Sequence, residues 1–184
     1  AAVEINGPKK VTLELKGKNS LNSGAGCAGV ELKNNANLVI TSSSGGQLDT
    51  CSDDGAGIGG INNTESAGSK RSVNKVVIKG GELTAIGKSC AIGAGAESMT
   101  QEGVVRSPGT ITISPAGAGI NAWAGSSETE NKALEGSTFF YSADITDLIK
   151  DKTYFYSREY VPYVPPADDD VKTTPDGTTS TTVK

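Results

Sequence analysis

The feature that most constrains this chain is a short Ala-Gly-aliphatic phrase that recurs at long intervals. Three of its four copies keep this order, with Val30, Ile58 and Ile120 as the aliphatic residues, and the third copy along the chain reads Ala91-Ile92-Gly93, with Ile92. The intervals between the four aliphatic residues are 28, 34 and 28 residues. Self-similarity at such a period is typical of an array of similar structural units. The repeat therefore constrains the fold before any residue is considered for its chemistry.

A second pattern recurs in step with the first. Each unit contains a short run in which apolar and polar residues alternate, as in residues 11–15, which is typical of a strand with one buried face. Turns rich in glycine and asparagine separate these runs. Stacking equivalent positions predicts three interior ladders of aliphatic side chains, which are Leu15/Ile40/Ile78/Ile113, Leu21/Leu48/Leu83 and Val30/Ile58/Ile92/Ile120.

These ladders predict an all-β fold, a single-stranded parallel, right-handed β-helix of about four to five short coils over residues 1–137. Strands of neighbouring coils would lie about 4.8 Å apart. The distribution of aromatic residues favours the same fold, because all nine lie at or after Trp123 and a narrow interior suits smaller side chains. The alternative is an antiparallel β-sandwich, which also accommodates short strands between turns.

The C-terminal part of the chain has a different composition. Residues 138–164 are rich in Phe and Tyr, and within them residues 142–150 carry the signals of a short helix, with Ser142 as N-cap and Lys150 in the last turn. We expect this segment to cap the open end of the stack, where unpaired backbone would otherwise be exposed. Residues 165–184, rich in Pro, Thr and Asp, are predicted to be a linker to a further module.

Composition excludes several functional classes. The net charge is −4 and the predicted pI is 4.9, which argues against nucleic acid as a partner. No apolar run approaches the roughly 20 residues that a membrane span needs. The chain has no histidine, which excludes Ser-His-Asp and Cys-His nucleophiles and imidazole zinc sites. We therefore predict no catalytic residues and no cofactor. Asp53 and Asp54 are interpreted as a solvated corner, and a calcium site at these two carboxylates is the alternative.

The three cysteines are predicted to be small thiols buried in the turns of the stack. Cys27 and Cys51 fall at the same predicted corner of adjacent coils, so a disulfide between them is the alternative.

Two features point to binding. Two long insertions, residues 62–74 and 96–109, leave the stack at equivalent points and carry Arg71 and Arg106, and insertions on one face of a repeat protein often form its binding face. Trp123 follows directly on the last copy of the phrase, in a predicted loop. Trp123, Tyr154 and Tyr156 are candidates for stacking on a sugar ring, and packing inside the cap is the alternative for the same side chains.

The repeat also carries a family resemblance. The segments Thr12–Leu21, Ala28-Gly29-Val30, Gly55–Gly60 and Ile78–Gly81 resemble the Gly-rich repeats of large secreted or surface proteins of anaerobic gut bacteria. More distantly they resemble right-handed β-helix carbohydrate-binding domains. The resemblance spans roughly residues 3–125 and implies a non-catalytic module on the bacterial cell surface or outside the cell. It transfers no binding residue.

Three functions follow as hypotheses. The first is a carbohydrate-binding or adhesion module, which would bind a polysaccharide or glycan through polar loops and aromatic stacking. The second is a structural spacer or protein-docking module of a multidomain surface protein, whose partner would bind the loops 62–74 and 96–109. The third is a calcium-dependent enzyme resembling polysaccharide lyases.

Overall fold

Strands make up most of the described chain. The computed structural model describes residues 1–61, 73–93, 109–117, 119–126, 137–150, 152–160, 172–173 and 179–180. Within these ranges the only helix is the single turn α2 (Thr146–Ile149). The predicted all-β character is therefore confirmed.

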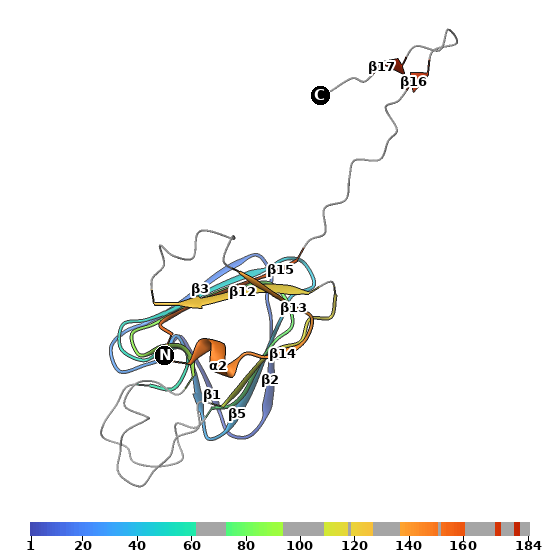
Figure 1. Ribbon diagram of the computed structural model, residues 1–184. Helices are drawn as coiled ribbons and strands as arrows, with labels where there is room; N and C mark the ends of the chain where they lie inside the picture. Colours follow the sequence, from blue (N-terminus) through green and yellow to red (C-terminus); the bar gives the residue numbers. More distant parts are fainter. Residues whose placement is uncertain are drawn as a thin grey trace.

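Three sheets of parallel strands surround one interior (Figure 1). Successive strands pass to sheets A, B and C in turn, and this order repeats along the chain. The parallel strands of sheet A are β1 (Val3–Asn6), β4 (Val30–Lys33), β7 (Ala56–Gly59) and β10 (Cys90–Gly93). Those of sheet B are β2 (Lys10–Glu14), β5 (Ala36–Thr41), β8 (Val73–Ile78) and β11 (Thr110–Ile113). Those of sheet C are β3 (Lys18–Ser23), β6 (Gln47–Ser52) and β9 (Glu82–Gly87).

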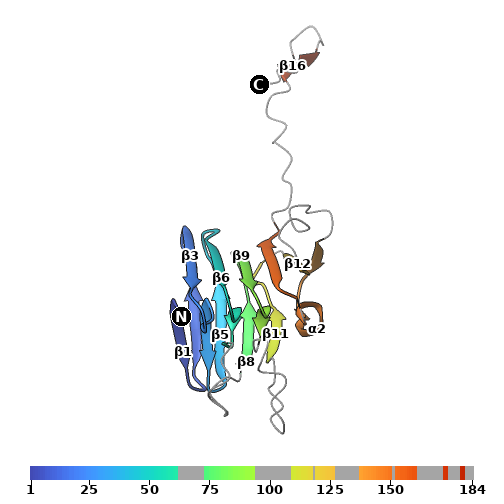
Figure 2. The ribbon, with the colours of Figure 1, turned by 90° about the vertical axis from the view of Figure 1, so that its left-hand side faces the viewer.

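Figure 2 shows β3, β6 and β9 side by side in chain order, and likewise β5, β8 and β11. Alternation along each strand puts one set of side chains into a shared aliphatic interior and the other set outside. In β5, for example, Leu38 and Ile40 are fully buried, and their counterparts Val76 and Ile78 in β8 are buried in register with them. The predicted parallel strands and aliphatic interior are thus confirmed.

The register of the first unit differs from the prediction by two residues. Leu13, and not Leu15, is in register with Ile40, and Asn19, and not Leu21, is in register with Leu48. Leu15 is still buried, because a shift of two residues keeps a side chain on the same face of a strand. The remaining pairings Ile40/Ile78/Ile113, Leu48/Leu83 and Val30/Ile58/Ile92 match the predicted ladders.

The Ala-Gly-aliphatic phrase forms part of sheet A, where backbones approach closely. Gly59 ends β7 with φ +137°, and a Cβ atom built on it would lie 1.8 Å from the carbonyl oxygen of Gly93. Gly59 and Gly93 are register partners on adjacent strands. Glycine at these two positions therefore lets the neighbouring strands β7 and β10 pack closely together.

The fourth copy of the phrase is not part of sheet A. Ile120 begins β12 (Ile120–Gly125), which belongs to sheet C, so its predicted alignment with Ile92 is wrong. Strand β15 (Tyr154–Glu159), from much later in the chain, lies between β9 and β12 and is antiparallel to both. Because β15 lies between them, β12 does not pair with β9 and is one strand further from it in sheet C. Sheet C ends with β13 (Thr138–Phe140) beside β12.

Residues 138–150 and 152–160 cover the end of the three sheets that lies opposite β1, β2 and β3. Helix α2 contacts the last strands β10, β11 and β12, and its neighbour β14 (Ala143–Asp144) pairs antiparallel with β11. Ile145 and Ile149 are buried there. The helix is shorter than the predicted residues 142–150, and Ser142 is not its N-cap, because the preceding residues extend sheet B as β14. Two further short strands, β16 (Lys172–Thr173) and β17 (Thr179–Ser180), pair with each other.

Candidate functional site

The three aromatic residues predicted to bind sugar lie together on the outer face of sheet C. Trp123 on β12 is the register partner of Tyr156 on β15, and Tyr154 lies two residues earlier on the same strand. The indole of Trp123 meets the ring of Tyr154 edge to face, with 5.9 Å between ring centroids. We call Trp123, Tyr154 and Tyr156 the aromatic strip. Trp123 belongs to a strand, so its predicted place in a loop is wrong.

Trp123 lies along its own strand, over Gly125. A Cβ atom built on Gly125 would lie 1.9 Å from the indole ring, so only glycine leaves room for this position of the ring. The neighbouring Ala122 is buried in the core, which places Trp123 on the opposite, outer face of β12. The Trp123 side chain remains partly exposed. The strand thus presents a partly exposed flat apolar ring that its own backbone supports.

Tyr156 combines a partly exposed side chain with a hydrogen-bonded hydroxyl. Its hydroxyl donates to Oε1 of Glu82 at 3.2 Å, and Nε2 of Gln47 donates to Oε2 of the same carboxylate at 2.7 Å. Burial, followed by the nearby Glu82 carboxylate, raises the pKa of Tyr156 above its usual value. The hydroxyl therefore stays protonated at neutral pH and remains a hydrogen-bond donor.

Tyr154 is more deeply buried than Trp123 and Tyr156. Only 7% of its surface is exposed, and it packs against the edge of the Trp123 ring. Its predicted role as a stacking platform does not fit this burial, since a sugar ring needs an open aromatic face. Tyr154 supports the position of Trp123.

Glu82 and Gln47 are site residues that the sequence reasoning missed. They lie on the first positions of β9 and β6, side by side in register, and both face outward beside Tyr156. The signal was available in the repeat, because Gly-Gly-Gln-Leu and Gly-Gly-Glu-Leu occupy equivalent positions. The repeat gives no sign that β15 pairs with β9, and this pairing is what brings Tyr156 next to Glu82 and Gln47.

Several predicted site residues lie outside the described residues or away from the strip. Arg71 and Arg106, and most of the insertions 62–74 and 96–109, lie outside the described residues. Asp53 is exposed at a corner. Asp54 accepts a hydrogen bond from the backbone N–H of Gly26 at 3.1 Å and lies 3.7 Å from Nζ of Lys88. Among the residues that the structure describes, no three Asp, Glu or Cys side chains gather as a metal-binding group.

Cys27 and Cys51 are free thiols, so the alternative Cys27–Cys51 disulfide is not formed in this structure. Cys51 lies in β6 and is only partly buried. Burial and the charge of Asp53 raise the pKa of its thiol.

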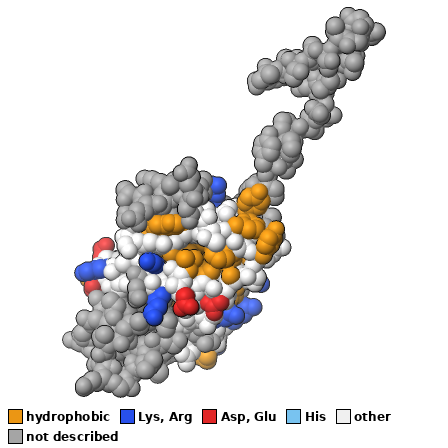
Figure 3. All heavy atoms as spheres, viewed as in Figure 1, with side chains coloured by type: hydrophobic (Ala, Val, Ile, Leu, Met, Phe, Trp, Pro, Cys, Tyr) orange, Lys and Arg blue, Asp and Glu red, His pale blue; other side chains and the backbone are white. Residues whose placement is uncertain are grey.

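A second group of aromatic side chains is exposed at the covered end of the sheets. Phe139 contacts both Tyr141 and Tyr160 edge to face, with ring centroids 4.8 and 5.2 Å apart. Tyr141 is 72% exposed and Tyr160 44% exposed. Figure 3 shows hydrophobic side chains gathered on this end of the molecule. This group is separate from the aromatic strip, which lies on the outer face of sheet C.

Comparison of the chain with protein-family models, with curated protein sequences and with solved structures found no significant match. Within the described ranges, no helix has the length and apolar character needed to cross a bilayer.

Proposed function

We propose that this chain is a non-catalytic carbohydrate-binding or adhesion module, displayed outside the cell on a right-handed parallel β-helix. The helix is favoured over a sandwich by the strand order, in which β1–β2–β3, β4–β5–β6 and β7–β8–β9 each contribute one strand to every sheet. These three groups of strands succeed one another along the chain in step with the repeated phrase of the sequence. The location outside the cell rests on the resemblance of the repeats to those of secreted and surface proteins.

The observation that carries the proposed binding function is the pairing of Trp123 and Tyr156 on the outer face of sheet C. Both side chains are partly exposed, and they come from segments more than 30 residues apart in the sequence. Glu82 and Gln47 add a carboxylate and an amide beside the rings. A sugar ring has an apolar C–H face and several hydroxyls. The aromatic rings can contact the C–H face, and the carboxylate and amide can hydrogen-bond the hydroxyls.

The binding mechanism has two parts. The Trp123 indole would stack on the C–H face of a sugar ring, with little entropy lost because Gly125 and Tyr154 already hold the indole in place. Glu82 would accept hydrogen bonds from sugar hydroxyls, and Gln47 would orient the carboxylate. No bond is made or broken.

A glycan array followed by calorimetry tests this proposal. Trp123→Ala should weaken binding of the best neutral glycan by roughly 30-fold, the effect of truncating a central aromatic contact worth about 2 kcal/mol. Tyr141→Ala is the matched control, since it removes an aromatic side chain that is 72% exposed and lies outside the strip.

The control variant should bind as the unmodified chain does. Equal affinity of the Trp123→Ala variant would remove the strip as the site. Absence of binding to every glycan would instead favour a structural spacer or protein-docking module. Release of unsaturated products from a uronate polymer in the presence of calcium would favour the lyase-like enzyme.

A further inference from the structure

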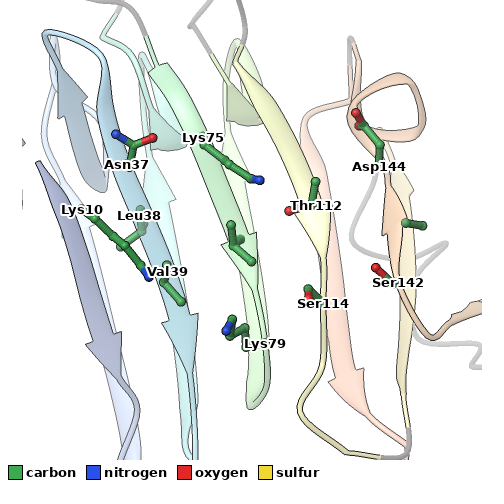
Figure 4. A pocket seen from close by; sticks show the side chains of 12 residues that line it. Lys10, Asn37, Leu38, Val39, Lys75, Lys79, Thr112, Ser114, Ser142 and Asp144 are labelled. Atoms are coloured by element: carbon green, nitrogen blue, oxygen red, sulfur yellow. The ribbon is translucent and has the colours of Figure 1, made fainter. Parts of the chain in front are cut away.

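A groove with a volume of about 650 Å³ crosses the outer face of sheet B. Its walls and floor come from β2, β5, β8, β11 and β14, so it runs along the stack and across the strands. Figure 4 shows its lining side chains side by side on these strands. The volume falls within the range of roughly 300–1,000 Å³ that is typical of ligand sites. The groove lies on a different sheet from the aromatic strip.

One part of the groove is positively charged. Lys10, Lys75 and Lys79 line it, and all three are exposed. Within the described part of the chain, none of the three forms an ion pair. This local charge is opposite in sign to the net charge of −4 of the whole chain. An anionic ligand would therefore find three ammonium groups that have no carboxylate bound to them.

The pairing register spaces these ammonium groups. Lys10 and Lys75 both align with Asn37, on the two sides of β5, so their backbones lie roughly 10 Å apart. Lys79 follows Lys75 by four residues, which is roughly 13 Å along an extended strand. In Figure 4 the Lys75 side chain extends from β8 toward Thr112 on β11. Charges spread in this way suit an extended chain with repeated anionic groups better than one small anion.

The rest of the groove is neutral or acidic. Val39 and Val77 form an apolar floor, and Ser114, Ser142 and Asp144 line the far end. Asp144 accepts hydrogen bonds from the hydroxyl and the backbone N–H of Thr146, and these bonds lower the pKa of its carboxyl. Its carboxylate therefore stays ionised, repels anionic groups from this end and accepts hydroxyl protons there.

We propose that this groove is a second binding site, which takes an extended anionic polysaccharide such as a uronate chain. The carboxylates of the sugar units lie over Lys10, Lys75 and Lys79, and sugar C–H groups lie on Val39 and Val77. Hydroxyls of the chain hydrogen-bond Ser114, Ser142 and Asp144. All of these residues lie on or next to strands of sheet B, so this proposal does not depend on the aromatic strip on sheet C.

The lining favours a polysaccharide over other polyanions. Among the described residues that line the groove none is aromatic, so a nucleic-acid base has no ring there on which to stack. The serine and threonine hydroxyls together with the valine floor match a ligand that is rich in both hydroxyl and C–H groups.

Calorimetry with the full chain and oligogalacturonate tests this site. The double variant Lys75→Gln/Lys79→Gln should weaken binding by about tenfold, since two exposed charge pairs are lost. The control variant Lys16→Gln/Lys150→Gln removes the same charge at exposed positions outside the groove and should retain full affinity. Affinity of the unmodified chain should also fall as NaCl is added, because exposed charges are screened.

Ligand controls separate the chemical classes. The methyl-esterified oligogalacturonate should not bind in the groove, because it keeps the sugar chain and loses the charges. Equal binding of this ester, of poly-glutamate or of a DNA oligonucleotide would overturn the proposal, as would absence of oligogalacturonate binding. An equal loss of oligogalacturonate affinity in the Lys16→Gln/Lys150→Gln control would show that net charge alone accounts for binding. That result would also overturn the proposal.

The two sites are distinguished by their variants. Trp123→Ala should leave oligogalacturonate affinity unchanged, and Lys75→Gln/Lys79→Gln should leave binding of a neutral glycan unchanged. Failure of one proposal is therefore visible without failure of the other.

Discussion

Gly59 occupies a position that no other amino acid fits without moving the backbone. Its φ of +137° is rarely adopted by residues with a Cβ atom, and the space a Cβ would need is taken by the carbonyl oxygen of Gly93. The glycines that follow Ile58 and Ile92 in the second and third copies of the phrase are thus explained by contact between adjacent strands of sheet A. No ligand is needed to account for them.

We predict that Gly59→Ala destabilises the fold by about 2 kcal/mol or more, because backbone strain adds to the clash with Gly93. The measurement is the free energy of unfolding from chemical denaturation. Gly24→Ala is the matched control, since Gly24 has no positive φ and no atom within 4 Å of a built Cβ. Equal stability of the two variants would contradict the proposed packing role of Gly59.

Residue patterns predicted the face of each side chain better than its register. Alternation over residues 11–15 puts Leu13 on the same face as Leu15, and both side chains pack in the interior, yet the residue in register with Ile40 is Leu13. Alternation repeats every two residues, so a shift of two preserves every inward assignment. Only the pairing of whole strands distinguishes the two registers.

At the scale of elements, the most consequential one is β15. It lies antiparallel between β9 and β12, and Phe155 from this strand is a fully buried core residue. The same strand carries Tyr156 to Trp123 and to Glu82. One element therefore both completes the core at this end and assembles the candidate site.

We predict that Phe155→Ala costs about 3–5 kcal/mol of stability, the range for emptying a buried aromatic position. Phe139→Ala, at a ring that is 38% exposed, should cost clearly less. Denaturant midpoints of both variants check this. If Phe155→Ala does not fold, Phe155→Leu should fold with an intermediate loss, because leucine keeps most of the apolar contact. A Phe155→Ala variant as stable as Phe139→Ala would contradict a core role for β15.

The whole molecule has two unlike ends. At one end α2, β13 and β14 cover the last parallel strands. At the other, inward positions of β2 are open: Val11 is 37% exposed, and its register partner Leu38 in β5 is fully buried. Stability should therefore change along the stack.

Hydrogen exchange followed by mass spectrometry measures this gradient. In the 184-residue chain, amides of β8 and β9 should exchange slowest, because each of these strands has paired strands on both sides and lies near the covered end. Amides of β1, β2 and β3 should exchange fastest among the parallel strands, since each pairs on one side within the described chain and lies at the opposite end. Uniform protection from β1 to β9 would show instead that the array opens only as a whole.

The sequence by itself determined the all-β class, the parallel strands, the aliphatic interior and the location of aromatic residues near one end. These features follow from local rules, namely the period of two in a strand, the turn chemistry of glycine and the spacing of the repeat. Tertiary structure decided the register of the first unit, the transfer of Ile120 to sheet C, the insertion of β15 and the groove of lysines across sheet B. Each of these depends on which distant strands become neighbours. A free-energy balance over the whole core sets that choice, and no local pattern records it.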